Sequence, residues 1–434
     1  MDVAVIAGII MIISVVVMLV MGVPIGISIG MSSALAMITI LPFGPGIVTC
    51  AQKMFTGVNS FSLLAIPFFI LAGNIMNNGG IAIRLVNCAR LISGRLPGSL
   101  AQTNIVANML FGAISGSGTA AAAAIGGTMA PIELEEGYDK DYVAAVNIAS
   151  APTGQLIPPS NTLIVYATVA GSVSVAACSW QVTYRALPGV FPDVYCGIHG
   201  KKRGYVSTFS VTPKEALKVL WDALPSLLLI IIVIGGILKG VFTATEGSAI
   251  AVVYALILSL CYRSLKIKDL PSIILSSCKT TCIVIFMIGV SSIMSWVMAY
   301  TMIPTAIANA MLSLSSNKYV ILLLMNVILL VVGTFMDPTP AVLIFTPIFL
   351  PICQSFGMDP VQFGIMIVFN LCIGTITPPV GVILFTGCKV VGISIEGVIK
   401  TLLPFFAAIA VVLLLVTYVP AMSMWIPSML GLVK

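Results

Sequence analysis

Residues 363–384 read FGIMIVFNLCIGTITPPVGVIL, an apolar run with a polar, proline-containing break in its middle. A proline inside a helix removes a backbone hydrogen bond and costs about 3 kcal/mol, and here Pro378 and Pro379 are adjacent. A second run, residues 142–177, is broken in the same way at Pro158-Pro159. Lipid cannot satisfy the backbone groups that such breaks free, so they persist at membrane depth only when they are buried in protein or line a water-filled cavity. The two runs therefore predict a polytopic membrane protein built around two broken helices.

The composition excludes a soluble protein. Of the 434 residues, 59% are hydrophobic and 8% are charged, whereas a soluble domain carries roughly 25% charged residues. A transmembrane helix needs about 20 mostly apolar residues, so the apolar runs predict an all-α fold with room for roughly ten to twelve crossings. We interpret the residues from Met1 onward as a first transmembrane span and not as a signal peptide.

The sequence also argues against several functional classes. The net charge of +6 is spread over short loops, which gives no nucleic-acid binding surface. His199 is the single histidine, so imidazole catalysis and a membrane-embedded enzyme are disfavoured. The ten cysteines fall mostly in apolar runs and are expected to be buried hydrophobes, not disulfides. No Walker loop is present, so ATP does not drive the protein.

The two halves of the chain repeat one pattern. The first half has GAISGSGT at 112–119 and GQLIPPSNT at 154–162, and the second has GTFMDPTP at 333–340 and GTITPPVG at 374–381. The distance from Gly112 to Pro158 is 46 positions, and from Gly333 to Pro378 it is 45. Matching interruptions in two halves are a sequence indication of inverted repeats and of a transporter binding site between them. The alternative is a pair of tolerated kinks.

Asp337 has two possible roles. It is the only acid between Tyr319 and Phe356, and an acid at membrane depth is a functional-site candidate. It also precedes Pro338, and Asp followed by proline at the first helical position is a good helix start. The two roles are compatible.

The polar groups at the breaks suit an anion and a cation. Helix N-termini carry partial positive charge that favours a carboxylate, so we expect an organic anion to contact Ser160, Asn161 and Thr162 from the first half and Pro338 and Thr339 from the second, beside Asp337. Freed carbonyls and hydroxyls are oxygen ligands for a hard cation.

These motifs resemble those of a known family. They are GVPIG at 22–26, IPFFILAG at 66–73, SGS at 115–117, IPPS at 157–160, MDPTP at 336–340 and GTITPPVG at 374–381. Over nearly its whole length the chain looks like the DctM-like large membrane subunit of TRAP (tripartite ATP-independent periplasmic) transporters.

The resemblance implies a function and its partners. The expected protein is a sodium-coupled importer of a small organic acid, of the C4-dicarboxylate, sialic-acid or sugar-acid class, in the bacterial inner membrane. The expected partners are a small four-helix membrane subunit and a periplasmic substrate-binding protein, and no cofactor is expected besides sodium as the coupling ion. A stand-alone sodium/organic anion symporter without a binding protein is the alternative.

The resemblance also implies sodium ligands and an elevator-type division of the chain, with about 11 transmembrane helices and two re-entrant hairpins. Sodium is expected between each hairpin tip and its broken helix, at Ser115, Ser117, Gly154, Ile157 and Pro158 in the first half and at Gly333, Thr375 and Thr377 in the second. The expected units are scaffold helices at 1–84, transport repeat 1 at 85–177, scaffold helices at 178–310, transport repeat 2 at 311–393 and a C-terminal helix at 394–434.

One segment departs from the family. Residues 178–200 should form a hydrophobic span, but Arg185, Pro188, Pro192 and Asp193 interrupt them. We expect no well-formed membrane helix there and poor or no transport by the chain. An out-of-frame reading of a short gene segment and a real divergence are both compatible with the pattern.

Overall fold

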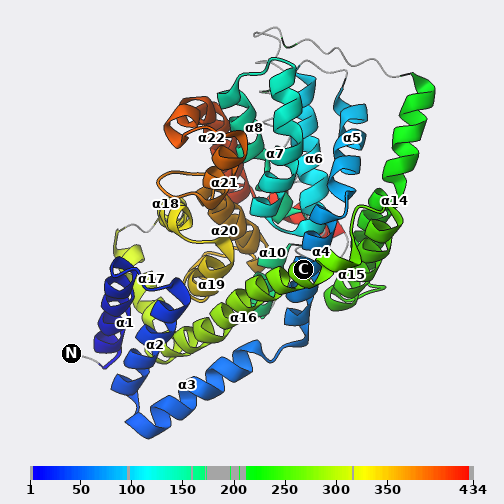
Figure 1. The fold of residues 1–434 in the computed structure, drawn as a ribbon. Helices are drawn as coiled ribbons and strands as arrows, with labels where there is room; N and C mark the ends of the chain where they lie inside the picture. Colours follow the sequence, from blue (N-terminus) through cyan, green and yellow to red (C-terminus); the bar gives the residue numbers. More distant parts are fainter. Residues whose placement is uncertain are drawn as a thin grey trace.

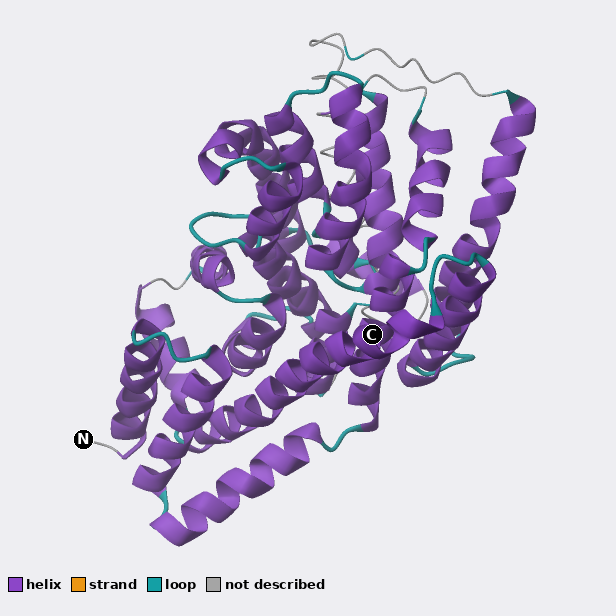
Figure 2. Cartoon of the chain, viewed as in Figure 1, coloured by secondary structure: helices purple, strands orange, loops and turns teal. Residues whose placement is uncertain are grey.

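The computed structural model describes residues 3–94, 98–157, 160–171, 173, 196, 205, 212–314 and 317–429. Within these ranges the regular elements are helices, and no strand occurs (Figure 2). The all-α class expected from the sequence is confirmed. The departing segment Cys178–Gly200 lies outside the described residues apart from Cys196, and so do Pro158 and Pro159.

The described N-terminal part of the chain forms helices and one 3-10 turn, several of which pack against the long helix α16 (Leu270–Tyr300). They are α1 (Val3–Val20), α2 (Ile25–Ile40), α3 (Phe43–Val58), the 3-10 turn η1 (Phe61–Leu64), α4 (Ala65–Asn78) and α5 (Ile81–Ser93). Figure 1 shows α3 running beside α16, and α2, α3 and α4 all pack against it. The left-handed Gly80, with φ of 72°, turns the chain from α4 into α5.

The first half of the repeated pattern forms a hairpin and a broken helix. The hairpin consists of α6 (Ser99–Ser115) and α7 (Gly118–Glu135), and the broken helix consists of α8 (Lys140–Ser150), α9 (Thr153–Leu156) and α10 (Asn161–Ala170). The run Ser99–Ala124 is thus divided near its middle, because Gly116 adopts a left-handed conformation, with φ of 61°, and ends α6. Only glycine adopts that conformation without steric cost.

The middle of the chain returns to long helices. These are α14 (Pro213–Leu238), α15 (Ala244–Cys261), η2 (Ile267–Asp269), α16 (Leu270–Tyr300) and α17 (Ile303–Leu314). Helices α14 and α15 both start with a capping box, Thr212 with Glu215 and Thr243 with Glu246. Each box satisfies backbone N–H groups that the first turn leaves unpaired, which explains an acid next to an apolar span.

The second half repeats the hairpin and the broken helix. The hairpin consists of α18 (Lys318–Phe335) and α19 (Pro338–Ser355), the broken helix consists of α20 (Pro360–Gly374) and α21 (Val382–Val391), and α22 (Ile395–Tyr418) and α23 (Pro420–Met429) follow. Both α19 and α20 begin with an aspartate cap followed by proline, at Asp337 and Asp359. Proline fits there because its missing N–H has no helical partner at that position.

The halves are interlocked. Helix α10 of the first half packs against α19 and α20 of the second, and α21 of the second half packs against α7 and α8 of the first. In Figure 1, α21 and α22 accordingly lie beside the upright helices α6, α7 and α8. The expected unit boundaries after residues 84 and 310 fall inside α5 and α17.

The outer helices have the apolar surface that a bilayer requires. Seven described stretches are long and apolar enough to cross a membrane: Phe61–Asn78, Pro213–Ile237, Ala244–Cys261, Ile267–Tyr300, Lys318–Phe335, Pro338–Ser355 and Ile395–Tyr418. Large apolar side chains such as Trp221, Ile231 and Ile283 are exposed on them. Shorter apolar helices accompany these stretches, and the figure of about 11 transmembrane helices stays a prediction.

Candidate functional site

The first hairpin tip is a polar turn. Ser117 caps α7, and its Oγ accepts a hydrogen bond from the Ala120 N–H at 3.3 Å. The N–H of Ser117 lies 3.5 Å from Ser115 Oγ, and Ser117 Oγ lies 3.0 Å from the hydroxyl of Thr119. Three hydroxyl groups are therefore held together at the N-terminal end of α7.

The second hairpin tip carries a carboxylate in the same place. Asp337 caps α19, and its Oδ1 accepts a hydrogen bond from the Thr339 N–H at 3.1 Å. The helix-cap role considered from the sequence is thus present. The side chain is nevertheless exposed, because it faces a cavity, so a role in binding remains compatible with it.

Each broken helix has its polar residues at the interruption. In the first, Ser160 caps α10 and its Oγ accepts from the Leu163 N–H at 3.4 Å. In the second, the carbonyl oxygen of Thr375 accepts from the N–H groups of Ile383 and Leu384 at 3.0 and 3.3 Å. The chain at the second break therefore folds back on α21 and is not a simple kink.

Glycine pairs bring each hairpin onto its broken helix. A Cβ atom built on Gly112 would lie 2.0 Å from the Cα of Gly154, and one built on Gly374 would lie 2.4 Å from the Cα of Gly333. Both pairs are direct backbone contacts, and any side chain would separate the helices. The two repeats thus have the same crossing, 42 and 41 positions apart in the sequence.

The two broken helices also touch one another. Gln155 Oε1 of the first accepts a hydrogen bond from Cys372 Sγ of the second at 3.3 Å. A Cβ atom on Gly118, at the first hairpin tip, would lie 2.6 Å from the side chain of Ile383 on α21. The interruptions of the two halves consequently meet in the interior.

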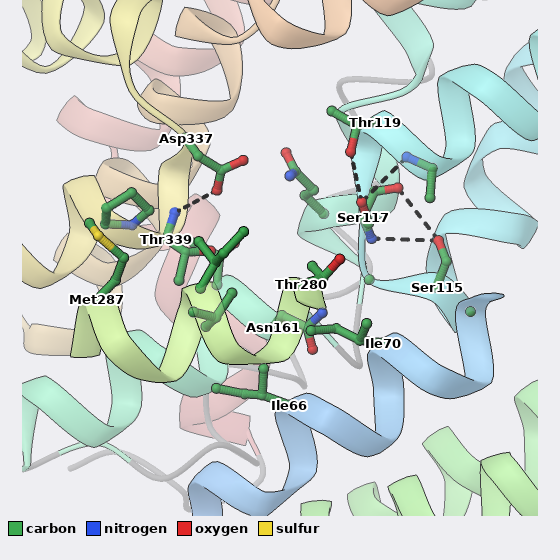
Figure 3. A pocket seen from close by; sticks show the side chains of 18 of the residues that line it. Ile66, Ile70, Ser115, Ser117, Thr119, Asn161, Thr280, Met287, Asp337 and Thr339 are labelled. Atoms are coloured by element: carbon green, nitrogen blue, oxygen red, sulfur yellow. Dashed lines mark hydrogen bonds between the residues drawn. The ribbon is translucent and has the colours of Figure 1, made fainter. Parts of the chain in front are cut away.

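A cavity of about 690 Å³ opens beside the hairpin tips. Figure 3 shows Ser115, Ser117 and Thr119 on one side of it and Asp337 and Thr339 on another, with Ile66, Ile70 and Thr280 along the wall. Its lining comes mainly from the tip of the first hairpin, the starts of α10 and α19, and the helices α2, α4 and α16, with single residues from α9 and α21.

The cavity collects part of the predicted site. Of the residues predicted for substrate, Asn161, Thr162, Asp337 and Thr339 line it, and of those predicted for sodium, Ser115 and Ser117 do so. The remaining described candidates, which are Ser160, Pro338, Gly154, Ile157, Gly333, Thr375 and Thr377, are not among the lining residues.

Six of these seven remaining candidates are buried, and Thr377 is half-buried. Gly154 and Gly333 form the glycine crossings, and Thr375 and Ser160 are nearly fully buried. The hydroxyl of Thr377 donates to the carbonyl oxygen of Ile373 at 2.7 Å. Pro158 lies outside the described residues.

Several lining residues are not among those that the sequence predicts for the site. Asn74 and Asn77 on α4, Thr280 and Met287 on α16, and Gln155 line the cavity. Gln155 stands inside a quoted motif, and the two asparagines close an otherwise apolar run. Thr280 and Met287 carry no such signal, because their part in the site depends on how α16 crosses the hairpins.

The cavity favours an anion through backbone dipoles. Among the described residues that line it there is no lysine, arginine or histidine. The N-terminal ends of α7, α10 and α19 all reach it, and each end carries partial positive charge. Asn161 Oδ1 is buried and has no hydrogen-bond partner among the described residues, which leaves an acceptor available to a hydrogen-bond donor or a cation.

The donor groups also fit a hard monovalent cation. Serine and threonine hydroxyls, backbone carbonyls and one carboxylate surround the tips, and hard cations prefer oxygen ligands. In the described part of the chain, no group of three or more His, Cys, Asp or Glu side chains could hold a transition metal. The oxygen donors present are of the kind that hard cations prefer.

Comparison with known proteins points to one family. Residues 12–422 match the profile of the family described as "Tripartite ATP-independent periplasmic transporter, DctM component". The chain is 52% identical over 402 residues to YgiK of Salmonella typhimurium, covering 92% of each chain.

Two relatives carry functional names. The chain is 40% identical over 393 residues to the isethionate TRAP transporter permease protein DctMQ of Oleidesulfovibrio alaskensis, covering 90% of this chain and 62% of that protein. It is 35% identical over 401 residues to the C4-dicarboxylate TRAP transporter large permease protein DctM of Rhodobacter capsulatus, covering 89% and 91%.

A solved structure shares the fold. The YdaH transporter of Alcanivorax borkumensis superposes with a TM-score of 0.58, covering 89% of each chain at 14% sequence identity. At that identity the likeness extends to the fold alone. It agrees with a membrane transporter architecture.

Proposed function

Because this chain belongs to the DctM component family of tripartite ATP-independent periplasmic transporters, we propose that it is the large permease subunit of a sodium-coupled system that imports a small organic acid. As a member of this family, the chain is a multi-pass protein of the bacterial inner membrane. It is a permease subunit and not an enzyme. The proposal concerns the coupling ion, the substrate and the partners.

The observation that carries the proposal is the cavity at the hairpin tips. Three helix N-termini converge on it, and no basic side chain lines it among the described residues. Helix dipoles alone compensate only part of the negative charge of an organic anion. A sodium ion bound close by would compensate the rest. Binding of the two would then be coupled, since each is stabilised by the other.

Sodium is assigned to two places, one in each repeat. The first lies between the tip residues Ser115 and Ser117 and the broken helix at Gly154 and Ile157. The second lies between Gly333 and the break at Thr375 and Thr377. Support comes from the paired glycine crossings, because they bring backbone carbonyls of two chain segments close together without intervening side chains.

The substrate is assigned to the cavity itself. Asn161, Thr162 and Thr339 would hydrogen-bond a carboxylate or sulfonate group, beside Asp337 and the buried residues Ser160 and Pro338. The relatives are named for isethionate and for C4-dicarboxylates, and these acids share a small size and at least one anionic group. The same chemistry allows sialic or sugar acids.

The partners and the motion follow from the same proposal. A small four-helix membrane subunit would join the scaffold, and a periplasmic binding protein would deliver the acid. Residues 85–177 and 311–393 would form a transport domain that moves against the scaffold. The interlocked packing of α10 and α21 supports this, because each repeat is tied to the other and both must move together.

Uptake into proteoliposomes tests the coupling. The assembled transporter, supplied with binding protein and labelled isethionate or succinate, should take up the acid with an inward sodium gradient and should stop when potassium replaces sodium. Undiminished uptake in potassium would refute the coupling.

Thr375 provides a residue-level test of the same claim. Thr375→Ala should raise the sodium concentration for half-maximal uptake by about ten-fold, the effect of roughly 1.4 kcal/mol, with a smaller change in KM for the acid. Thr375→Ser, which keeps the hydroxyl, is the matched control and should stay close to the parent protein. Equal sodium dependence in all three proteins would remove Thr375 from the site.

A further inference from the structure

A buried carboxyl group lies inside the first hairpin, away from the cavity. Glu133 on α7 is 1% exposed. Its two carboxyl oxygens lie 3.3 and 3.4 Å from the Asn104 Nδ2 on α6, which donates to them. Within the described part of the chain Glu133 has no ion-pair partner. Burying such a group without a cation is costly, so its presence calls for an explanation.

Glu133 is the end of a chain of side-chain amides. Asn104 Oδ1 accepts from Asn108 Nδ2 at 2.8 Å. The same Asn108 Nδ2 lies 2.9 Å from Ser150 Oγ and 3.2 Å from Asn147 Oδ1, both on α8. The chain thus joins both arms of the hairpin to the first broken helix. All five residues are almost completely buried.

The chain of amides reaches the glycine crossing. Asn108 is four residues before Gly112, and Ser150 is four residues before Gly154. Asn108 and Gly112 share one face of α6, because residues four apart on a helix do so, whereas Ser150 ends α8 and Gly154 lies on the short helix α9 that follows. The hydrogen bond between Asn108 and Ser150 therefore lies one turn of α6 from the backbone contact of the two glycines and joins α6 to the end of α8.

The orientation of the Asn108 amide depends on the rest of the chain. Asn108 Oδ1 is buried and accepts no hydrogen bond among the described residues. That leaves an unpaired acceptor, which is a cost, and it persists because Asn104 Oδ1, Ser150 Oγ and Asn147 Oδ1 all accept from the amide nitrogen. Asn104 in turn is oriented by Glu133. Loss of Glu133 would let the Asn104 amide turn over and would remove one of the three acceptors that orient Asn108.

The second repeat has a similar arrangement without the acid. Asn370, four residues before Gly374, donates through Nδ2 to Asn326 Oδ1 at 2.7 Å. Asn326 then donates to the hydroxyl of Thr417 on α22 at 3.2 Å. This network is anchored on a neighbouring helix, whereas the first is anchored within its own hairpin by Glu133.

We propose that Glu133 is a positioning residue for the sodium site of the first repeat. Through Asn104 and Asn108 it holds the crossing of Gly112 and Gly154 in the geometry that presents the hairpin-tip oxygens to the ion. Glu133 does not touch the ion or the acid. The inference rests on the proposed sodium coupling and adds a residue to it.

Sodium-dependent thermal stabilisation of the purified protein tests this without knowledge of the acid. The unfolding temperature is measured against sodium chloride, with potassium chloride keeping the ionic strength constant.

Glu133→Met should raise the sodium concentration for half-maximal stabilisation at least about five-fold, the lower end of typical couplings between sites. Glu133→Gln retains an oxygen acceptor for Asn104 and should stay within about two-fold, since an uncharged amide still accepts. Glu135→Met, an exposed change on the same helix, is the matched control and should have no effect.

The two proposals fail in different ways. If the parent protein shows no stabilisation by sodium, the sodium coupling is wrong and this inference falls with it. If the parent protein responds and Glu133→Met responds at the same concentrations, this inference alone is overturned.

A double substitution separates positioning from simple stability. Glu133→Met leaves Asn104 without an acceptor and can unfold the protein, but replacing both partners by apolar residues is often tolerated. The variant Glu133→Met with Asn104→Leu should recover the unfolding temperature in potassium and still need at least about five-fold more sodium. Its sodium requirement should not exceed that of either single variant, because both act through one contact. Parent-like sodium stabilisation of the double variant would overturn the proposal.

Discussion

At the scale of single residues, the polar groups of this chain serve the backbone and the site together. Ser117, Ser160 and Asp337 all cap helices, and two of them, Ser117 and Asp337, also line the cavity. A cap orients its side chain at a helix N-terminus, where the partial positive charge lies. The same side chains can therefore satisfy the helix and place oxygens beside a ligand.

Asp337 allows the two roles to be separated. Asparagine caps helices as well as aspartate does, so Asp337→Asn should leave the unfolding temperature nearly unchanged while uptake falls at least about ten-fold, equivalent to roughly 1.4 kcal/mol. Asp337→Ala should lose the cap as well, at a cost of about 0.5–2 kcal/mol. Thermal unfolding and uptake, measured on both variants, check this. Normal uptake by Asp337→Asn would leave the residue with a capping role alone.

At the scale of elements, each hairpin and its broken helix form one packing unit. The arms of the first hairpin pack together and against α8 and α9, and α18 packs closely against α20. Small residues permit such approach where no hydrophobic driving force acts between helices in lipid. The glycine pairs are points of direct backbone contact within these units.

A methyl group at a crossing should separate these elements. A Cβ atom on Gly154 would lie 2.5 Å from the Cα of Gly112, and the clash is with backbone that cannot rotate away. Gly154→Ala should therefore destabilise the protein by about 1–3 kcal/mol, as overpacking does, and reduce uptake. Gly127→Ala on α7 meets no atom within 4 Å and is the control. Equal unfolding temperatures for the two variants would contradict the tight crossing.

At the scale of the whole molecule, the cavity lies between two sets of helices. One wall comes from α2, α4 and α16, and the other comes from the hairpin tips and α10. If the second set moves against the first, the cavity would open to either side of the membrane in turn. The interlocked repeats would then move as one body around a fixed frame.

Cross-linking the two walls tests this motion. Thr280 on α16 and Thr119 on α7 both line the cavity (Figure 3). In a cysteine-free background, Thr280→Cys combined with Thr119→Cys should lose uptake after treatment with a flexible bifunctional maleimide. Each single variant treated with the same reagent should keep it. A cross-linked protein that transports at the untreated rate would exclude relative movement of these walls.

Much of the architecture was accessible from the sequence alone. The scarcity of charge determined a membrane protein, because 8% charged residues cannot cover a soluble surface. The matched motifs located two glycine-rich polar elements and two broken helices, since proline and glycine act on the local backbone regardless of context, and the family resemblance added the two hairpins. Local rules also identified Ser117 and Asp337, whose capping depends on their immediate neighbours.

Only the tertiary structure decided which of these residues share a cavity. Thr280 and Met287 enter the site because α16 crosses the hairpin tips, and Gly112 meets Gly154 because α6 packs on α9. The role of Glu133 was equally hidden, since in the sequence it stands in an acidic stretch with Glu135 and Glu136. Burial separates it from them, and burial depends on contacts between distant segments, which periodicity and spacing do not specify.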